Sequence, residues 1–337
     1  MKLRLLSSQS QMQTSSMYTA WIASLIVTVC LPRIAMSQNS SLNSSDSPSI
    51  EAKGNSTKGA LVTSAPNATS ATANSDQPFE TTGVQDPKMV AAYRYDPATK
   101  QIVPWMMESR DGLAIVDGDI VLGTEQQLVN KDDEETLKGC TDVRSKLWPK
   151  GQVAYDLPQE FPNRGAIIKA FDEYNTRTKI KFSSRSAQTK DYLQFTPTDN
   201  PNIGGQSYLG RQHGAQTLWI NRNTAKWNTG TVIHELGHAL GLVHEQCRGD
   251  REKYIDIIWG NVLPGYQSQF VQLFSNGRDL GTYDYRSIMH YPKNAFARPG
   301  TTTTIVPKQN GVSIGQRDHL SEGDIGGLHQ LYAQELQ

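Results

Sequence analysis

The sequence predicts an α+β fold in two lobes, preceded by segments that do not belong to it. From about residue 139, short strand-like runs and two helical patterns come first, and a loop-rich stretch with one closing helical pattern follows. Hydrophobic residues make up 37% of the 337-residue chain, which is low for a fully folded chain of this size. The folded part is therefore expected to begin well inside the sequence.

The N-terminus has the pattern of a secretory signal peptide over residues 1–37. Lys2 and Arg4 precede the apolar run AWIASLIVTVCL, and the small residues Ala35 and Ser37 suit a cleavage site. The run is shorter than the roughly 20 residues of a spanning helix, so an uncleaved anchor is the weaker alternative. The sequence predicts a secreted, extracellular protein with no stable membrane association.

Two further segments precede the folded part. Residues 38–76 are rich in Ser, Thr, Asn and Ala and contain no aromatic residue, which predicts a disordered spacer. Residues 77–138 regain aromatic and β-branched residues and end in the charged run NKDDEETLKG. We interpret them as a semi-ordered pro-segment with an exposed joint, followed by one continuous domain over residues 139–337.

Each element of this domain has its own pattern. Alternating and β-branched runs predict strands at residues 151–157, 180–184, 192–197 and 216–222. Helical spacing predicts helices over residues 164–178, 224–244 and 321–336. Ser321 and Asp324 are spaced like a capping box at the start of the last helix. No internal repeat is found.

Charge and cysteine content exclude several classes of protein. The 33 basic and 33 acidic residues balance, which disfavours a nucleic-acid partner or another polyanion. Cys30 lies in the predicted signal peptide, which leaves Cys140 and Cys247. Two cysteines do not make a disulfide-built scaffold, so the domain must depend on a hydrophobic core.

The stretch HELGHALGLVH, residues 234–244, has the composition of a metal site. His234 and His238 are four apart, so on a helix they share one face and can bind one ion. Neutral imidazole is a good Zn²⁺ ligand. Glu235 lies at the edge of the same face, where it can reach a metal-bound water as a general base.

A third histidine extends the motif. On a continuing helix His244 would lie about 15 Å from His234 along the axis, too far to share an ion. The helix must therefore end between them, and Gly241 can adopt the left-handed conformation that turns the chain. Three imidazoles leave one zinc position open, which is the catalytic arrangement and not the structural one.

The extended motif, together with HEQCRGDR at residues 244–251 and YRSIMHY at 285–291, resembles the astacin family of metzincin zinc endopeptidases. The resemblance covers roughly residues 139–333. It implies a two-lobed domain with a mixed twisted sheet and the active-site helix in the first lobe. It also implies one catalytic zinc ion, and cleavage of protein or peptide substrates by a zinc-bound water activated by Glu235.

The same resemblance assigns further roles. Met289 is expected to form the floor of the zinc site, and Tyr291 to act as a switchable fifth ligand that stabilises the oxyanion. VDGDIVL, with Asp119, is similar to the latency motif whose aspartate binds the zinc of the zymogen. Val116 stands where the family usually has phenylalanine.

Activation is expected to require a second protease. The resemblance implies processing near Gly139, with a basic alternative in DVRSK, after which the new ammonium pairs with Glu245. The two disulfides usual in the family are absent. We hypothesise that Cys140 and Cys247 pair instead, since Cys140 lies near the new N-terminus.

The substrate site is less well defined by sequence. By family analogy the strand at residues 216–222 forms the upper rim of the cleft and pairs with extended substrate. Arg317 is a candidate for a basic pocket beyond the scissile bond, with a surface arginine as the alternative. The remaining histidines lack ligand spacing and are predicted to be surface or packing residues: His213, His290, His319 and His329.

The sequence therefore predicts a secreted zinc endopeptidase made as a zymogen. Two alternatives remain open at this point. Another metzincin protease is disfavoured by Glu245 directly after the third histidine and by the lack of a pro-segment cysteine. A non-catalytic zinc-fold binding or adhesion module is disfavoured by the intact Glu235 and by Asp119.

Overall fold

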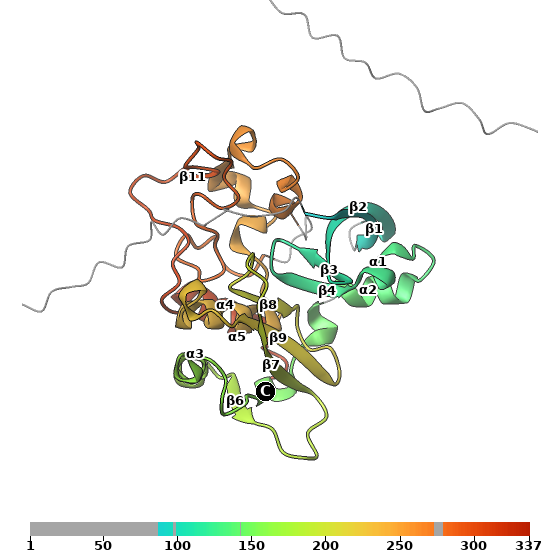
Figure 1. Ribbon diagram of the computed structural model, residues 1–337, viewed down its shortest axis with the longest axis vertical. Helices are drawn as coiled ribbons and strands as arrows, with labels where there is room; N and C mark the ends of the chain where they lie inside the picture. The colour runs from blue at the N-terminus through green and yellow to red at the C-terminus, as the bar shows by residue number, and fades with distance from the viewer. Residues whose placement is uncertain (1–86, 97–98, 142, 273–278) are drawn as a thin grey trace, which may run out of the picture. The chain divides into compact units, whose positions relative to one another are not determined.

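The computed structural model describes residues 87–337 except 97–98, 142 and 273–278 (Figure 1). The predicted signal peptide and spacer, and residues 77–86 of the predicted pro-segment, lie outside this part of the chain. Among the described residues no helix is long and apolar enough to span a membrane.

The N-terminal region, residues 87–141, is a small folded unit and not the semi-ordered segment that the sequence suggests. Its elements are β1 (Met89–Asp96), β2 (Gln101–Arg110), β3 (Leu113–Val116), β4 (Ile120–Thr124), α1 (Glu125–Val129) and α2 (Glu134–Thr141). The strands are joined in antiparallel order, and a hydrophobic cluster that includes Met107, Leu122 and Leu137 also contains Leu209 of the following domain. The core of this region is therefore shared with the following domain.

The predicted exposed joint is also partly structured. Helix α2 covers Gly139, and its first turn contains Glu134 and Glu135, whose charges suit a helix N-terminus. The side chain of Asp133 accepts a hydrogen bond from the backbone N–H of Thr136 at 3.0 Å. Cleavage near Gly139 therefore requires this helix to unwind locally.

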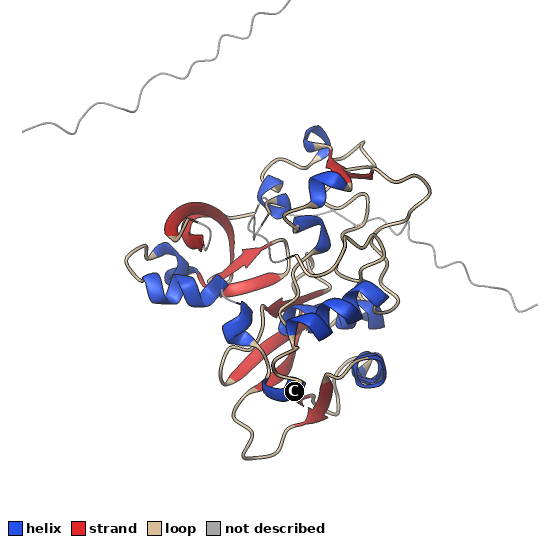
Figure 2. Cartoon of the chain, turned by 180° about the vertical axis from the view of Figure 1, so that it is seen from behind, coloured by secondary structure: helices blue, strands red, loops and turns tan. Residues whose placement is uncertain are grey.

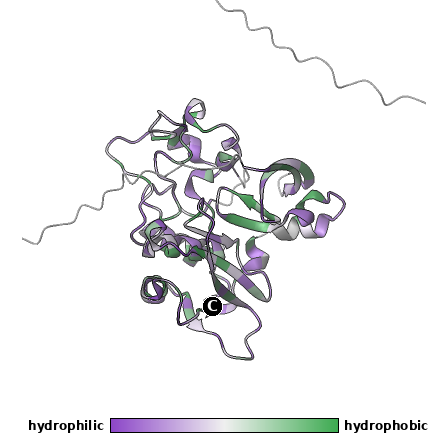
Figure 3. Ribbon diagram, viewed as in Figure 1, coloured by the Kyte–Doolittle hydropathy of each residue, from purple (hydrophilic) through white to green (hydrophobic). Residues whose placement is uncertain are grey.

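A nine-stranded mixed sheet runs through both regions in the order β1-β2-β3-β4-β8-β9-β7-β5-β6. The strands of the second region are β5 (Gln152–Asp156), β6 (Lys181–Ser184), β7 (Tyr192–Thr198), β8 (Gly205–Tyr208) and β9 (Ala215–Asn221). β5, β6, β7 and β9 are parallel, whereas β8 is antiparallel to β9. β4 pairs with β8 in parallel, and both strands of the β3–β4 hairpin are largely apolar (Figure 3).

Two helices pack with the sheet to form the first lobe. The predicted helix over residues 164–178 is confirmed as α3 (Arg164–Arg177), which buries Ile167, Phe171 and Tyr174. The second helical pattern forms α4 (Thr229–Ala239), and Asn228 caps it, so the helix is shorter than predicted. The preceding residues instead form a short 3-10 helix and an extended Trp227.

The second lobe is rich in loops and short 3-10 helices, as predicted (Figure 2). It contains the two-stranded sheet of β10 (Ile255–Ile257) and β11 (Ile305–Pro307) and the closing helix α5 (Glu322–Leu331). The predicted capping box of Ser321 and Asp324 is confirmed. The Asp324 carboxylate also accepts hydrogen bonds from Ser287 Oγ at 2.6 Å and from the backbone N–H of Ile288 at 2.9 Å, which attaches α5 to the turn containing Met289.

Buried tyrosine and tryptophan side chains fix the position of α4. Trp148 Nε1 donates to the carbonyl oxygen of Ala239 at 2.9 Å, and Tyr332 Oη donates to that of Leu240 at 3.0 Å. Tyr174 Oη donates to the carbonyl oxygen of Ile233 at 2.8 Å. These bonds use polar tips on otherwise apolar rings, so they anchor both the middle and the end of the helix.

Replacing Gly230 by alanine is expected to destabilise the domain. A Cβ built on Gly230 would lie 1.8 Å from the backbone carbonyl oxygen of Arg317, so α4 and that loop would have to separate. Overpacking of this kind costs about 1–3 kcal/mol, which exceeds the gain of roughly 1 kcal/mol from replacing glycine within a helix. Urea unfolding of the full chain should show a lower transition midpoint.

Gly165→Ala in α3 is the matched control. A Cβ at Gly165 has no atom within 4 Å, so only the helix-propensity gain of about 0.5–1 kcal/mol remains. Its midpoint is expected to stay the same or to rise. If Gly230→Ala behaved like Gly165→Ala, the close packing of α4 against the backbone at Arg317 would be refuted.

Candidate metal centre

Helix α4 and the turn after it place three histidines around one point. His234 and His238 lie one turn apart on α4, and Gly241 ends the helix with φ 101°. A Cβ at Gly241 would lie 2.5 Å from Val143 Cγ1, so neither the conformation nor the space admits a larger residue. The chain then returns and brings His244 to the other two histidines, as the sequence predicts.

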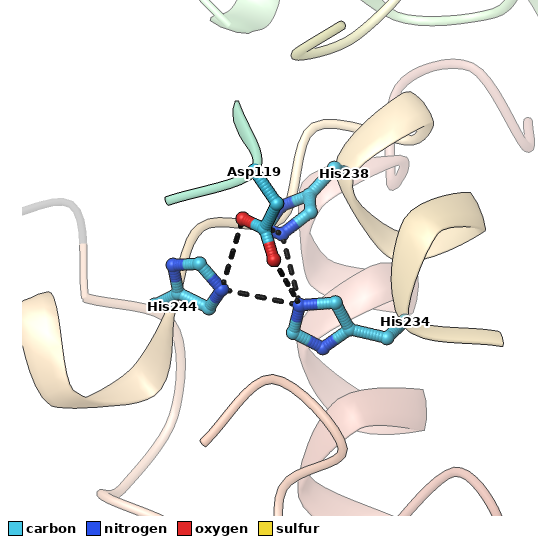
Figure 4. Close-up of side chains that lie close together, drawn as sticks. All are labelled: Asp119, His234, His238 and His244. Atoms are coloured by element: carbon cyan, nitrogen blue, oxygen red, sulfur yellow. Dashed lines mark hydrogen bonds and ion pairs between the residues drawn. The ribbon is translucent and has the colours of Figure 1, made fainter. Parts of the chain in front are cut away.

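The three Nε2 atoms converge (Figure 4). His234 Nε2 lies 3.1 Å from Nε2 of His238 and 3.1 Å from Nε2 of His244, and all three side chains are buried. Asp119 at the start of β4 completes the group: one ligand atom of each residue lies within 4.8 Å of every other. Its carboxylate oxygens are 3.3–3.4 Å from the three Nε2 atoms.

Second-shell hydrogen bonds define which nitrogen of two histidines faces the centre. His234 Nδ1 donates to the carbonyl oxygen of Ile288 at 2.8 Å, and His238 Nδ1 donates to that of Leu242 at 2.8 Å. With the proton on Nδ1, the lone pair on Nε2 faces inward. Converging lone pairs repel each other in a buried site unless a cation lies between them. The three Nε2 atoms therefore fit a metal ion such as Zn²⁺.

The Asp119 carboxylate is stabilised in its charged form. Burial alone would raise its pKa, but the three histidines outweigh burial and hold the pKa of Asp119 well below its ordinary value. Asp119 therefore supplies a negative charge directly over the histidine cluster. Its hairpin is held by strand pairing, in which the backbone N–H of Ser207 donates to the Asp119 carbonyl oxygen at 3.0 Å.

Glu235 is a second buried carboxylate beside the centre. It is 2% exposed, and its Oε2 has no hydrogen-bond partner among the described residues. Burial and the charge of Asp119 raise the pKa of Glu235 well above its ordinary value, against the opposing effect of Arg317. A Cβ at Gly205 would lie 2.7 Å from Glu235 Oε1, so this glycine of β8 makes the space that the carboxylate occupies.

Met289 and Tyr291 approach the centre from the second lobe. Met289 is 2% exposed, and its Sδ would lie 2.6 Å from a Cβ at Gly237, so the thioether packs directly beneath α4. The Tyr291 ring lies 4.5 Å from that of His244 between centroids, and its hydroxyl donates to the carbonyl oxygen of Asp117. In this form, therefore, the phenol is hydrogen-bonded to the turn of the β3–β4 hairpin.

Arg317 is partly buried beside the same turn. Its Nη1 donates to the carbonyl oxygens of Ile288 at 2.8 Å and His290 at 3.0 Å. The guanidinium thus holds the backbone around Met289, while its charge acts on both Asp119 and Glu235. A freely exposed surface arginine, the alternative left open by the sequence, does not describe this side chain.

Glu245 borders a cavity of about 340 Å³ behind the metal centre. Other lining residues include Gly241, Met289 and Asp324. Burial raises the pKa of Glu245 to about 8, against the opposing charge of Arg248, whose Nε lies 3.6 Å from Glu245 Oε1. The backbone N–H of Asp284 donates to the same oxygen at 2.7 Å.

The prediction for the cleft rim was wrong by one strand. The predicted strand at residues 216–222 is β9, which lies between β8 and β7 inside the sheet. β8 is the end strand of the sheet within the second region, and its other side pairs with β4 of the N-terminal region. β8 was missed because Gly205 and the polar Gln206 interrupt any hydrophobic alternation.

The hypothesis of a disulfide between Cys140 and Cys247 is contradicted for this form of the chain. Cys247 is a free, buried thiol. Burial, followed by the charge of Asp117, raises the pKa of this thiol well above its ordinary value. Cys247 therefore lies beside Asp117 in the D-G-D turn, residues 117–119, of the β3–β4 hairpin. It has no disulfide partner in this form.

The four remaining histidines are packing or surface residues, as predicted. His290 is buried, and its Nε2 lies 2.7 Å from Tyr283 Oη. His213 has φ 58° in a turn, and the side chain of His329 accepts from the backbone N–H of Lys179 at 3.3 Å. His319 is exposed. None belongs to the metal-site group found among the described residues.

The fold and the centre together define a class of protein: a two-lobed α+β domain in which three histidines converge on one point beside a buried methionine. The sequence profile of the astacin family, peptidase family M12A, matches residues 141–333. The chain therefore belongs to the astacin family. The predicted fold class, the family and zinc as its metal are confirmed, and the domain is a zinc metallopeptidase domain.

Individual relatives agree with this assignment. The chain is 42% identical over 191 residues to zinc metalloproteinase nas-14 of Caenorhabditis elegans, covering 56% of this chain and 37% of that protein. It is 33% identical over 221 residues to zinc metalloproteinase nas-4 of the same organism, covering 64% and 68% of the two chains. The first of these relatives thus extends well beyond the matched part.

A solved structure gives the same result. High choriolytic enzyme 1, a hatching-enzyme zinc protease from medaka (Oryzias latipes), superposes with a TM-score of 0.51 and 34% sequence identity. The match covers 56% of this chain and 95% of that chain.

Proposed function

We propose that the chain is a secreted zinc endopeptidase made as a latent precursor. The observation that supports this most directly is the position of Asp119. Its carboxylate faces the three histidine nitrogens at 3.3–3.4 Å, where it takes the open position of the site. A carboxylate there is a sound zinc ligand and would keep out both water and substrate until the hairpin leaves.

In the proposed mechanism, His234, His238 and His244 hold the zinc ion. When bound, zinc supplies a Lewis acid that polarises the peptide carbonyl and lowers the pKa of water. Glu235 accepts the proton from the attacking water and returns it to the leaving amine. The position of Glu235 suits this exchange, because its Oε2 has no hydrogen-bond partner among the described residues and is available to take and return a proton.

Tyr291 is proposed to donate a hydrogen bond to the developing oxyanion once the hairpin has left. The Tyr291 hydroxyl is a hydrogen-bond donor in the precursor. The bond to the Asp117 carbonyl oxygen in the precursor uses the same donor, which supports the view that the hairpin occupies the position of substrate.

Tyr291→Phe is expected to lower kcat of the activated enzyme about 100-fold with little change in KM, because one oxyanion donor is worth roughly 10²–10³ in kcat. Steady-state kinetics on a short peptide would measure both. Tyr285→Phe is the matched control: it removes a phenol of the same segment that donates at 2.8 Å to the Tyr254 carbonyl oxygen. Equal losses in both variants would contradict the proposed role.

Activation is proposed to occur by cleavage near Gly139 by another protease. The cavity of about 340 Å³ beside Glu245 supports this, because it leaves room for a new N-terminus to reach a buried carboxylate. An ammonium group there would add a second positive partner to Glu245 beside Arg248, whose Nε lies 3.6 Å from Glu245 Oε1. Substrate is proposed to pair with β8 after β4 has left it.

Arg317 is proposed to favour an acidic side chain just beyond the scissile bond. Its charge already acts on two carboxylates at the centre, Asp119 and Glu235, which supports a positive potential on that side of the cleft. Secretion is proposed from the signal-like residues 1–37. Protein sequencing of the exported chain should then begin after Ser37.

One assay tests the proposed activity. The uncut chain is expected to leave casein intact, and the chain nicked near Gly139 is expected to cleave it. A chelator should abolish cleavage and added zinc should restore it. N-terminal proteomic profiling of the products would then give the side-chain preference. A nicked, zinc-loaded chain that cleaves neither casein nor a peptide library would favour the non-catalytic binding module instead.

A further inference from the structure

The three histidines differ in the hydrogen bonds of their outer ring nitrogens. Nδ1 of His234 and Nδ1 of His238 each bond to a backbone carbonyl oxygen. Nδ1 of His244 is buried and has no hydrogen-bond partner among residues 87–337 as described. A histidine that binds zinc through Nε2 needs a hydrogen-bond acceptor at Nδ1 to fix the orientation of its ring. His244 has no such acceptor within hydrogen-bond distance among the described residues.

Asp117 lies on the side of His244 that faces away from the centre. Its Oδ2 is 3.7 Å from His244 Nδ1, whereas Asp119 Oδ1 is 3.4 Å from Nε2 of the same ring. Both residues belong to one D-G-D turn between β3 and β4. The two carboxylates of this turn therefore lie at opposite nitrogens of one imidazole.

The Asp117 carboxylate lies near two side chains that could donate to it, the His244 ring and the weaker Cys247 thiol donor. The residue is fully buried, and neither Oδ atom has a hydrogen-bond partner in the described part of the chain. A buried polar group in this state is costly, so a donor must come close. Once His244 Nε2 binds a metal ion, Nδ1 must carry the proton and becomes that donor.

We propose that Asp117, in the turn of the β3–β4 hairpin, is a positioning residue that orients His244 for binding zinc. Asp119 acts as ligand and Asp117 orients His244 as acceptor for its Nδ1–H. The precursor then binds zinc more tightly than the activated domain, which loses both carboxylates when the hairpin leaves. This inference rests on the proposed latent zinc site.

A pair of variants isolates the effect. Asp117→Gly removes the carboxylate without backbone strain, since the residue has φ 50°, and it keeps the carbonyl oxygen that binds Tyr291. The matched control is Asp111→Gly. Asp111 also precedes a glycine in a turn and has φ 52°, but it is exposed and in the turn between β2 and β3.

The first measurement is zinc release from the full, uncut chain into excess chelator. Asp117→Gly should release zinc about 10-fold faster than the unaltered chain or more, the usual effect of losing a second-shell partner. Asp111→Gly should not change the rate. A wild-type rate in Asp117→Gly would overturn the proposal.

The second measurement is ¹⁵N-histidine NMR of the zinc-loaded chain. The His244 Nδ1–H should be protected from exchange in the unaltered chain and in Asp111→Gly, and unprotected in Asp117→Gly. If Asp117→Gly instead made the uncut chain as active as a variant without Asp119, Asp117 would only dock the hairpin. An unaltered chain that bound no zinc would overturn both proposals, whereas a chain that bound zinc as described but stayed inactive after nicking would refute the proposed function and not this role of Asp117.

Discussion

Glu235→Gln is expected to lower kcat of the activated enzyme by about 10²–10⁴ or more while zinc content stays the same, the range attributed to general acid–base catalysis. Glutamine keeps the size of the side chain beside Gly205, but it cannot accept and return a proton. Glu235 is not one of the side chains that converge on the metal position, so zinc binding should not depend on it.

Kinetics on a fluorogenic peptide, with zinc measured by atomic absorption on the same sample, would check this result. Glu160→Gln is a suitable control, because Glu160 is an exposed glutamate of the first lobe. Appreciable proteolysis by Glu235→Gln with full zinc content would overturn the mechanism. Loss of zinc together with activity would instead indicate that Glu235 has a structural role.

Asp119→Ala is expected to give the uncut chain peptidase activity. Removing one partner of a buried charged cluster costs about 3–5 kcal/mol, and each 1.4 kcal/mol is a factor of ten. The hairpin should therefore open on the order of 100-fold more often or more. The activity should stay below that of the nicked chain, because β4 still pairs with β8 and the carbonyl oxygen of Asp117 still binds Tyr291.

Hydrolysis of a small peptide by the uncut chain measures this effect, with gel analysis to show that no cleavage has occurred. Asp132→Ala, an exposed aspartate of the same region, should remain inactive. If Asp119→Ala were as silent as Asp132→Ala, latency would depend on steric cover by the hairpin and not on the carboxylate.

The metal-binding residues could be predicted because their spacing is local. A four-residue interval fixes His234 and His238 on one helix face, and Gly241 must then end the helix for His244 to return. The same holds for the capping box of α5, which depends on residues three apart. Short-range geometry of this kind is determined by backbone dihedrals and needs no knowledge of the remaining chain.

Pairings between distant segments could not be predicted in this way. β8 has no hydrophobic alternation, and it is a strand because β9 and β4 pair with its two sides. The N-terminal region looks semi-ordered by composition, yet it folds around a hydrophobic cluster that also includes Leu209 of the next domain. The position of the Cys247 thiol could likewise not be predicted, because it is buried beside Asp117, a residue far away in the sequence.

The sequence by itself determined the convergence of the three histidines, the carboxylate of Glu235 beside them and the family, since each depends on residues close together in the chain. Only the tertiary structure decided what the two aspartates of the D-G-D turn face. Asp119 approaches the three inner nitrogens and Asp117 the outer nitrogen of His244 because β4 pairs with β8. The contacts of the two aspartates with the histidines join residues more than a hundred positions apart, so the burial and the charge effects at this site exist only in the folded chain.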